Sequence, residues 1–481
     1  MSKTIDTSDL PDLSHVRSIH ILGICGTAMG TFAGMLSAKG YRVTGSDAGV
    51  YPPMSTQLEA LGIELMEGYQ ASNLDHQPDL VIVGNVIRRD NPEAQAVRDR
   101  GFVHTSFPRA LGALFLQDKH AVVLAGTHGK TTTTSMVAHL LHFAKLDPTF
   151  LVGGIPLNFG QSFRVGQGAF VVLEGDEYDT AYFDKVPKFK HYQPQTAVLT
   201  SVEFDHADIY ADLAEVEAAF DLLAQLVASR QGSLLPCATD PGAMATAERA
   251  PAGLEVRPYG GYPGPELRDL HATDEGYTLS LWRNDEPIGD LLIPVYGRHN
   301  VANALAAYEV CRTLGVDHGT LAEGLRAFKG VKRRMELRGR PHDVAVFDDF
   351  AHHPTAVATT LEGVRERHPD HRIFALFEPR SATSCRKVFQ QPYTEAFDAA
   401  DRVWIAANAR AAELPEAERF LPEDLVAGLR LRGVEAEFGP DVETIVREVA
   451  QSVRPGDLVV VMSNGAFGGI HERLIEAINA R

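Results

Sequence analysis

The stretch from Ala125 to Thr134, AGTHGKTTTT, brings together glycines, one lysine and a run of threonines, which are residue types that bind phosphate. In a glycine turn that leads into a helix, backbone N–H groups and the positive helix end point at an anion. A lysine ammonium can then hold the outer phosphates, and a threonine hydroxyl can hold magnesium. We assign these two roles to Lys130 and Thr131, with Gly126 and Gly129 shaping the turn.

The segments on either side of this loop distinguish a nucleotide-binding loop from an ordinary glycine turn that happens to contain a lysine. Leu124 stands where the pattern G-x-x-x-x-G-K-[ST] has its first glycine, so the match is imperfect. The apolar run His120–Leu124 nevertheless predicts a strand before the loop, and the spacing over Ser135–Ala144 predicts a helix after it. We therefore predict ATP binding. The loop residues expected to contact the nucleotide are Gly126, Thr127, His128, Gly129, Lys130, Thr131 and Thr132.

Acidic residues follow the next predicted strand, Phe170 to Leu173. Magnesium takes few protein carboxylates and keeps several waters and phosphate oxygens. Glu174, at the strand tip, is the predicted ligand. The remaining acids of this turn fit a solvated acidic turn, and we assign them to one: Asp176, Glu177 and Asp179.

A histidine follows another predicted strand, Thr196–Ser201, in the segment Glu203 to His206. A lone histidine is more often structural than a ligand. The position of His206 after a strand, beside Asp205, favours a metal role.

The N-terminal region contains a second glycine turn, Gly23–Gly30, between a predicted strand and a predicted helix, as in nucleotide-binding α/β units. Cys25 and Ala28 replace two glycines of the G-x-G-x-x-G fingerprint, so the turn predicts a diphosphate site and not an NAD site. Asp47 ends the following strand. Binding to a ribose or base and a turn or cap role are equally supported for it.

Four apolar stretches beyond residue 335 alternate with helical stretches and predict a second open α/β domain. Active loops in such domains lie at the carboxyl ends of the strands. Three loops stand there: Asp348–Pro354, Glu378–Ser381 and Ser463–Gly469. The first fits a metal site or a helix cap, Arg380 in the second can grip a carboxylate with two bonds, and the third brings backbone close to a ligand.

Two further features precede that domain. Asn300 and Asn303 lie one helical turn apart; asparagine can bind an adenine edge or cap the helix, and the spacing favours the cap. The basic run Lys329–Arg334 fits a solvated surface, or it supplies one arginine to the nucleotide phosphates.

The bulk properties narrow the function classes. A length of 481 residues predicts about three domains. The net charge of −18 argues against nucleic acid as a partner. The four cysteines lack metal-ligand spacing and are expected to be reduced thiols in a cytoplasmic protein. No signal peptide or membrane span is predicted, and the sequence does not indicate an oligomeric state.

The segments GTHGKTTTT, LEGDEYD, EFDHADIY, YGRHNVANALAA, KRRME and DDFAHHPTA occur in this order. Together they resemble the Mur ligase family, and the resemblance spans nearly the whole chain. It implies an α/β protein of three domains: a Rossmann-like UDP-sugar domain over residues 1–118, a P-loop ATPase domain over 119–334 and a Rossmann-like peptide-binding domain over 335–481.

Finer features point to one activity within the family: HILGICGTAMG, TGSDAGVYPPMSTQLE, FDKVPKFKHY, EPRS and VMSNGAFGGIHE. The resemblance implies an ATP- and Mg²⁺-dependent ligase that joins UDP-N-acetylmuramate to L-alanyl-γ-D-glutamyl-meso-diaminopimelate in peptidoglycan recycling. The alternatives are a biosynthetic L-alanine-adding ligase, a nucleotide-dependent binding protein that does not ligate and, more weakly, a folate polyglutamate ligase.

The resemblance also implies residue roles. Lys130 holds the outer phosphates, Thr131 and Glu174 bind one magnesium, and His206 belongs to a second magnesium site. Asn300 lies near the adenine, Arg334 near the phosphates and Asp349 near the ribose. The expected peptide contacts are Arg380, Ser381 and Asn464, and the expected UDP-sugar contacts are Gly23, Gly26, Thr27, Met29, Gly30 and Asp47.

Two features depart from the family pattern. Several Mur ligases carry a carbamylated lysine about fifteen residues after the histidine, where this chain has Phe220-Asp221 and no lysine. The DNPR signature for diaminopimelate is also absent. Completion of the second metal site and recognition of the third peptide residue must therefore use other groups.

Overall fold

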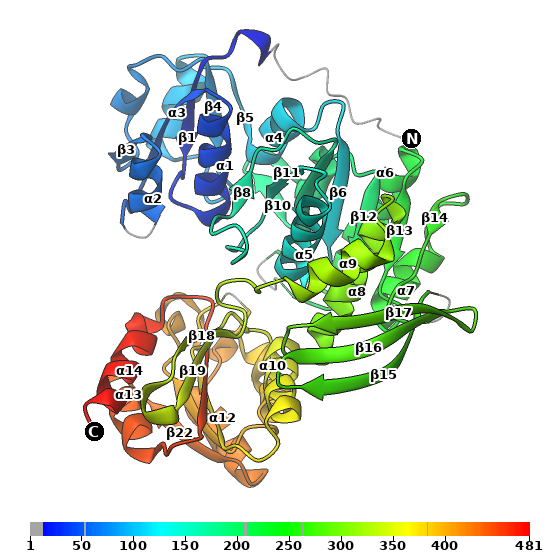
Figure 1. Cartoon of the computed structure of the whole chain (residues 1–481). Helices are drawn as coiled ribbons and strands as arrows, with labels where there is room; N and C mark the ends of the chain where they lie inside the picture. The colour runs from blue at the N-terminus through cyan, green and yellow to red at the C-terminus, as the bar shows by residue number, and fades with distance from the viewer. Residues whose placement is uncertain (1–12, 52–53, 206–208, 262–263, 382) are drawn as a thin grey trace. The chain divides into compact units, whose positions relative to one another are not determined.

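The computed structural model describes residues 13–51, 54–205, 209–261, 264–381 and 383–481. The chain folds into two compact units (Figure 1). The first comprises the chain up to Glu203 with Ala214–Glu266 and Leu305–Gly324. The second comprises Phe204–Leu213, Leu267–Ala304 and Leu325–Arg481.

The N-terminal part of the first unit is a parallel sheet with the order β3-β2-β1-β4-β5. Apolar runs such as Leu80–Val83 form its middle because a parallel strand is buried on both faces. The strands are β1 Ser18–Leu22, β2 Arg42–Asp47, β3 Glu64–Glu67, β4 Leu80–Val83 and β5 His104–Ser106, and the helices are α1 Thr27–Ala38, α2 Met54–Ala60, α3 Pro92–Asp99 and α4 Phe107–Phe115.

A second sheet in the same unit has the order β14-β13-β12-β6-β9-β7-β8, and only the β7–β8 pair is antiparallel among the pairs described. Its strands are β6 His120–Ala125, β7 Thr149–Leu151, β8 Phe163–Arg164, β9 Phe170–Gly175, β12 Thr196–Leu199, β13 Ser233–Pro236 and β14 Glu255–Val256. The hairpin β10 Asp179–Ala181 and β11 Asp184–Pro187 follows β9, and the helices are α5 Lys130–Phe143, α6 Leu213–Ser229 and α7 Pro241–Glu248.

Beyond Glu266, the second unit contains a three-stranded sheet of β15 Glu266–Thr273, β16 Gly276–Arg283 and β17 Glu286–Ile293. Two helices, α8 Arg298–Thr313 and α9 His318–Arg326, contribute residues to both units.

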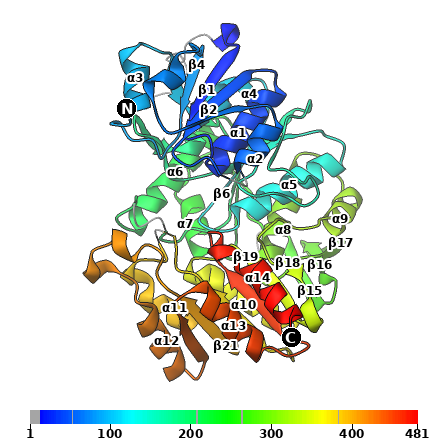
Figure 2. The same cartoon turned by 90° about the vertical axis from the view of Figure 1, so that its left-hand side faces the viewer.

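A mixed sheet of order β18-β19-β23-β20-β21-β22 completes the second unit; β18 pairs antiparallel with β19, and the other strand pairs described in this sheet are parallel. One face packs against α10, α11 and α12, and the other packs against α13 and α14 (Figures 1 and 2). The strands are β18 Glu336–Gly339, β19 Ala345–Asp349, β20 Ile373–Phe377, β21 Arg402–Ala406, β22 Glu435–Gly439 and β23 Leu458–Met462; the helices are α10 Pro354–Arg367, α11 Gln390–Ala396, α12 Pro422–Leu431, α13 Val442–Ser452 and α14 Ile470–Asn479.

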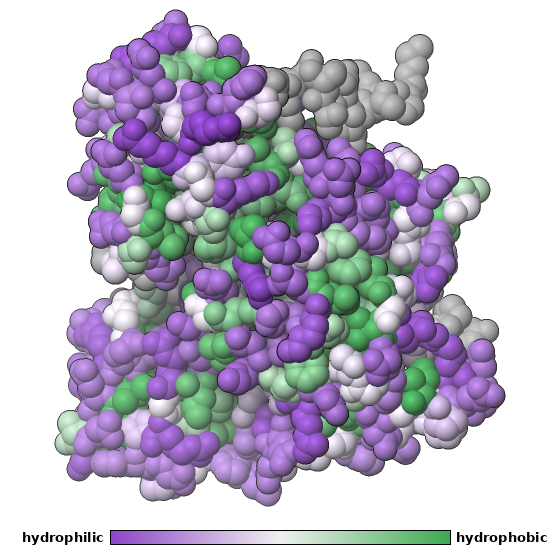
Figure 3. All heavy atoms as spheres, turned by 45° about the horizontal axis from the view of Figure 1, so that its top comes forward, coloured by the Kyte–Doolittle hydropathy of each residue, from purple (hydrophilic) through white to green (hydrophobic). Residues whose placement is uncertain are grey.

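The surface is mainly hydrophilic on the face shown in Figure 3, as expected for a chain with an ordinary hydrophobic fraction of 44%. Hydrophilic residues cover most of the face in Figure 3, and apolar residues form small groups between them. None of the helices in the described ranges combines the length and apolar character that a membrane span requires. The four cysteines are free thiols, as predicted.

Candidate active site

The predicted phosphate loop connects the carboxyl end of β6 to the start of α5. Gly126 has a φ of +123°, and a Cβ at this position would lie 2.2 Å from Thr200 Oγ1. Only glycine therefore allows the loop to approach the end of β12 so closely. Gly129 has a φ of +82° and is the N-cap residue of α5, so the helix starts directly at Lys130.

The other loop residues are tied to the segment after β12. Thr127 N–H donates to the Ser201 carbonyl at 2.9 Å, and His128 N–H donates to Ser201 Oγ at 3.0 Å. Thr132 is buried in the first turn of α5. The loop therefore has a fixed shape at the positive end of a helix, as an anion site requires.

The Lys130 ammonium lies inside this loop. It donates to the Gly126 carbonyl at 2.7 Å and lies 3.0 Å from Glu177 Oε2, whose side chain is 2% exposed. Burial would lower the pKa of Lys130, but the carboxylates of Glu177 and Asp176 outweigh burial and raise it above its usual value. The assignment of Glu177 to a solvated turn was therefore wrong.

Asp176 is also largely buried, contrary to the same prediction. Its Oδ2 accepts hydrogen bonds from Lys188 Nζ at 2.7 Å and from the Tyr178 hydroxyl at 3.0 Å. Burial raises the pKa of Asp176, but Lys188 outweighs burial and holds it below its usual value. Lys188 lies in the segment FDKVPKFKHY, but the sequence assigned it no role of its own, because nothing in its spacing links it to the loop. Asp179 pairs with Lys185 on the hairpin. Its side chain is 35% exposed, so Asp179 is more exposed than Asp176 and closer to the predicted solvated turn.

Thr131 and Glu174 meet as the magnesium prediction requires. The Thr131 hydroxyl donates to Glu174 Oε2 at 3.1 Å, and Gly153 N–H donates to Oε1 at 2.6 Å. Glu174 belongs to β9, which continues to Gly175. Burial and the nearby Asp176 carboxylate raise the pKa of Glu174. A hydroxyl beside a carboxylate is a set of hard oxygen donors that fits Mg²⁺.

His206 lies outside the described residues. Of its neighbours in sequence, Asp205 is buried and its Oδ1 accepts a hydrogen bond from Thr383 Oγ1 at 2.5 Å. Phe204 stacks on Phe389 with ring centroids 6.3 Å apart. The segment before His206 is thus packed within the second unit.

The predicted UDP-sugar residues gather where β1 and β2 end. Gly23 has a φ of +81°, and its N–H donates to the Ser46 carbonyl at 2.8 Å. Asp47 Oδ2 accepts from Cys25 N–H at 2.9 Å, and Oδ1 accepts from Gly49 N–H at 3.2 Å. Asp47 therefore acts as a turn aspartate that braces the glycine turn. Helix α1 begins after Gly26, at Thr27, and its first turns bury Met29 and Gly30.

The second unit holds the remaining predicted nucleotide residues. Asn300 lies inside the first turn of α8, where its amide donates to the Tyr296 carbonyl at 2.8 Å and accepts from Asn303 at 3.0 Å. It does not cap the helix, so that interpretation was wrong. Asp349 is buried at the end of β19 and accepts from Met335 N–H at 2.8 Å. Burial raises the pKa of Asp349 against the lowering effect of Arg334.

Two other residues of this region have local roles. The Arg334 guanidinium lies 4.9 Å from the centre of the Phe350 ring. The predicted cap is present in the loop after β19, because His353 Nδ1 accepts from Thr355 N–H at 3.3 Å at the start of α10.

The loops predicted to face a peptide lie together after β20 and β23. Arg380 is exposed and crosses the backbone of Gly465, where a Cβ would lie 2.3 Å from Arg380 Cδ. Ser381 is buried, and its hydroxyl donates to Ser384 Oγ at 2.9 Å. Asn464 Oδ1 is buried and has no hydrogen-bond partner within the described ranges.

Two side chains that the sequence analysis did not single out hold these loops. Glu378 Oε2 accepts from the Ser463 hydroxyl at 2.5 Å, and Glu378 Oε1 lies 3.8 Å from Arg380 Nη1. Arg333 Nη2 donates to the carbonyls of Ser463 at 2.6 Å and Gly465 at 2.7 Å. The basic run containing Arg333 had been assigned to a solvated surface or to phosphate.

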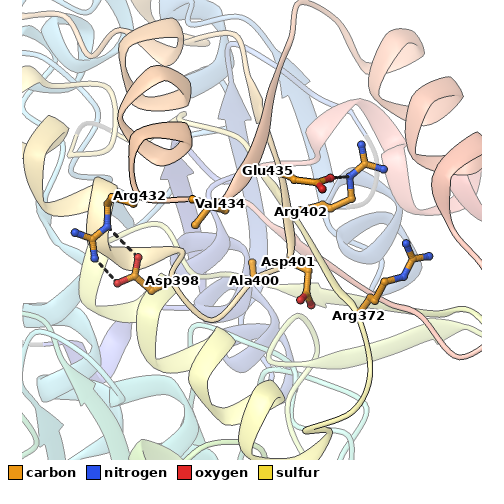
Figure 4. Close-up of a pocket in the computed structure, with 9 residues that line it drawn as sticks. Arg372, Asp398, Ala400, Asp401, Arg402, Arg432, Val434 and Glu435 are labelled. Atoms are coloured by element: carbon orange, nitrogen blue, oxygen red, sulfur yellow. Dashed lines mark hydrogen bonds and ion pairs between the residues drawn. The ribbon is translucent and has the colours of Figure 1, made fainter.

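A hollow lies at the opposite edge of the same sheet, where the strands begin. Its lining residues surround the starts of β20, β21 and β22 (Figure 4). The basic side chains there have acidic partners: Arg372 with Asp457, Arg402 with Glu435 and Arg432 with Asp398. None of the predicted site residues is among the residues that line this hollow.

Comparison with known proteins assigns this arrangement to a family. Three family profiles match in succession: "Mur ligase family, catalytic domain" over residues 18–119, "Mur ligase middle domain" over 124–311 and "Mur ligase, glutamate ligase domain" over 333–465. The chain belongs to the Mur ligase family. As a Mur ligase it is an enzyme, an ATP-dependent ligase that forms a C–N bond, with three α/β domains of that family.

Individual relatives cover nearly the whole of this Mur ligase. It is 39% identical over 461 residues to the UDP-N-acetylmuramate–L-alanyl-γ-D-glutamyl-meso-2,6-diaminoheptandioate ligase of Escherichia coli K12, covering 96% of this chain and 98% of that protein. The crystal structure of a murein peptide ligase from Psychrobacter arcticus 273-4 superposes with a TM-score of 0.71 at 35% identity, covering 97% and 99%. The UDP-N-acetylmuramate–L-alanine ligase of Arthrobacter sp. FB24 is 37% identical over 450 residues, covering 92% and 91%.

Proposed function

We propose that this Mur ligase joins UDP-N-acetylmuramate to the tripeptide L-alanyl-γ-D-glutamyl-meso-diaminopimelate and thereby returns cell-wall peptide to peptidoglycan synthesis. The observation that carries the proposal is the 39% identity, over 96% of the chain, to the Escherichia coli ligase named for these substrates. The Psychrobacter arcticus structure supports it with a match over 97% of the chain. We place the reaction in the cytoplasm, where ATP and nucleotide sugars are made.

The reaction requires a carboxylate to become an acylating group. The muramyl carboxylate attacks the γ-phosphorus of ATP, ADP leaves, and an acyl phosphate forms. The alanine amine of the peptide then attacks the acyl carbon, phosphate leaves, and the nitrogen loses a proton as the amide forms. Lys130 and Arg334 supply positive charge for the negative charge that develops on the transferred phosphoryl group.

The donor set of the central loop matches the ion that such a transfer uses. Thr131 and Glu174 would hold Mg²⁺, which would supply positive charge against the negative charge of the phosphate groups. His206 is assigned to a second ion. Asn300 and Asp349 are assigned to the adenosine part of ATP, and the turn around Gly23 and Asp47 is assigned to the UDP-sugar.

The peptide contacts are assigned to the loops after β20 and β23. Arg380 is the exposed cation of this cluster, and a guanidinium binds a carboxylate through two parallel hydrogen bonds. A tripeptide that carries several carboxylates suits such a group. Asn464 adds a buried oxygen that can accept a hydrogen bond from a peptide N–H.

One experiment separates this function from its rivals. The enzyme is incubated with ATP, magnesium and UDP-N-acetylmuramate, and with either the tripeptide or free L-alanine, and products are identified by mass. We expect the larger kcat/KM with the tripeptide. A larger value with L-alanine would favour the biosynthetic activity, which the identity to the Arthrobacter enzyme supports. ATP hydrolysis without an amide product would contradict both ligase functions.

A further inference from the structure

Arg333 occupies an unusual position between two loops of the second unit. Its backbone is left-handed, with a φ of +59°, a conformation that costs free energy for a residue other than glycine. One nitrogen of its guanidinium, Nη2, donates to both the Ser463 and Gly465 carbonyls, and Nε lies 3.4 Å from Asp348 Oδ1. The side chain thus spans from the segment before β18 to the glycine-rich loop after β23.

The loop that Arg333 holds is the support for Arg380. Gly465 N–H donates to Ser463 Oγ at 2.9 Å, and that hydroxyl in turn donates to Glu378. Arg380 lies directly against Gly465, and half of its side chain surface, 51%, is exposed. A shift of the Ser463–Gly465 loop would therefore move both the surface beneath Arg380 and the carboxylate beside it.

The other end of Arg333 belongs to the segment assigned to the nucleotide. Arg334 follows it directly, and the Arg333 carbonyl accepts from Phe350 N–H at 2.9 Å. Asp349 accepts from Met335 N–H at 2.8 Å and sits next to Asp348, the acid beside Arg333. Arg333 is thus bonded to both groups of loops through side chain and backbone.

We propose that Arg333 is a positioning residue that fixes the peptide-facing loop, Ser463–Gly465, to the nucleotide-facing segment that carries Arg334. The inference rests on the proposed function, in which the peptide amine must reach the acyl carbon. Such attack needs reacting atoms about 3–3.5 Å apart, and a misplacement of about 1 Å can cost about a hundredfold in rate. A rigid connection between the two segments meets this requirement.

Arg338 provides a matched control. Its Nη1 lies 3.3 Å from Asp348 Oδ2, and the side chains of Arg333 and Arg338 are both 31% exposed. Arg338 also pairs with Glu472, and its described hydrogen bonds do not include the loop carbonyls. Arg333→Ala and Arg338→Ala therefore each remove one cation from Asp348, and only Arg333→Ala releases the loop. Alanine keeps a Cβ, so the left-handed backbone remains strained in the variant.

We expect Arg333→Ala to raise the KM for the peptide by about tenfold or more, because the released loop no longer supports Arg380. We also expect it to lower kcat, because the peptide amine is then misplaced for attack. The KM for ATP should change by no more than about twofold, as should both KM values in Arg338→Ala. Arg333→Lys should recover part of the loss, since an ammonium can donate to the same two carbonyls. An unchanged peptide KM in Arg333→Ala, or an equal rise in Arg338→Ala, would overturn the proposal.

A second measurement keeps this inference separate from the proposed function. Hydrogen–deuterium exchange over residues 463–469 should be faster in Arg333→Ala than in Arg338→Ala, whatever the substrate is. If the wild-type enzyme forms no amide with the tripeptide, the proposed function fails. Equal exchange in the two variants would show that Arg333 does not hold the loop, and the positioning role would fail independently.

Discussion

The pair formed by Lys130 and Glu177 allows the catalytic and structural roles of the phosphate loop to be separated. Lys130→Met removes the charge but keeps an unbranched side chain, and it leaves the Glu177 carboxylate, 2% exposed, without its lysine partner. Removing one member of a buried ion pair costs about 3–5 kcal/mol. We expect Lys130→Met to lose about 3 kcal/mol of the free energy of unfolding, because Gly126 then also loses a hydrogen-bond donor.

The sign of the pH effect follows from the pKa of Lys130, which its neighbouring carboxylates raise above the usual value. A raised pKa means that the contribution to stability is fully present below the unfolded value of about 10.4 and is lost only as pH rises through the folded value. Measurements at about pH 8 therefore sample the whole contribution.

The double variant tests the argument. Lys130→Met combined with Glu177→Gln replaces the ion pair by neutral side chains of similar size, an exchange that is often nearly neutral for stability. We expect the double variant to recover to within about 1 kcal/mol of wild type, which makes it about 2 kcal/mol more stable than Lys130→Met. Ligation should remain at least about a thousandfold reduced in both Lys130 variants, because the charge on the phosphates is still unmatched.

Urea unfolding followed by circular dichroism, together with product formation, measures both quantities. If the double variant is no more stable than Lys130→Met, the two side chains are not coupled as described. If Lys130→Met keeps near-normal turnover, the assignment of the lysine to ATP is wrong.

Two further predictions follow from the geometry. Gly126→Ala should abolish ATP binding, measured by titration calorimetry, because the new Cβ would lie 2.2 Å from Thr200 Oγ1. Gly160 has a φ of +70° and open space around it, so Gly160→Ala should lower the free energy of unfolding by only about 1–2 kcal/mol and bind ATP normally. Equal ATP binding by the two variants would refute the steric argument. Burial raises the pKa of Asp348, but His471 and Arg333 outweigh burial and hold it below its usual value. Asp348→Asn should therefore lose about 2 kcal/mol of the free energy of unfolding at pH 7. This deficit should begin to shrink as pH falls below about 4 and disappear as pH falls through the lower pKa of the folded state. A deficit in urea unfolding that is independent of pH would contradict this.

Local sequence patterns were sufficient to predict the strands and loops that carry the site. The apolar run before the phosphate loop is β6, and the acid predicted to meet Thr131 does so. The helix start was predicted five residues late, since threonines disfavour helix interiors. In the structure their hydroxyls bond back to carbonyls one turn earlier, as Thr133 does to Gly129 and Thr134 to Lys130.

Contacts between segments that lie far apart in the sequence could not be predicted from local patterns. Glu177 stands in an acidic turn that looks solvated, and only the fold brings Lys130, 47 positions earlier, to within 3.0 Å of it. Arg333 and Gly465 are likewise 132 positions apart. Helix α7 lies in a stretch rich in proline and glycine, and β22, with charges at alternate positions, is an edge strand that lacks the continuous apolar run of its neighbours.

The distribution of charge explains how an acidic chain can bind anionic substrates. Two cations assigned to substrate-facing regions have a carboxylate beside them: Lys130 has Glu177, and Arg380 has Glu378. A long basic side chain loses about 2 kcal/mol of rotamer entropy when a ligand orders it. A neighbouring carboxylate orders the side chain in advance, so less of this entropy is lost on binding. The same carboxylate also repels an anionic ligand. Removing the carboxylate should therefore weaken ligand binding where ordering of the basic side chain is the larger effect, and strengthen ligand binding where charge repulsion is the larger effect. Solvent screens this repulsion weakly at both sites, because the side chains of Glu177 and Glu378 are only 2% and 11% exposed. The two sites differ in the cation, since the Arg380 side chain is 51% exposed and that of Lys130 is 12% exposed, so Arg380 has more to gain from being ordered.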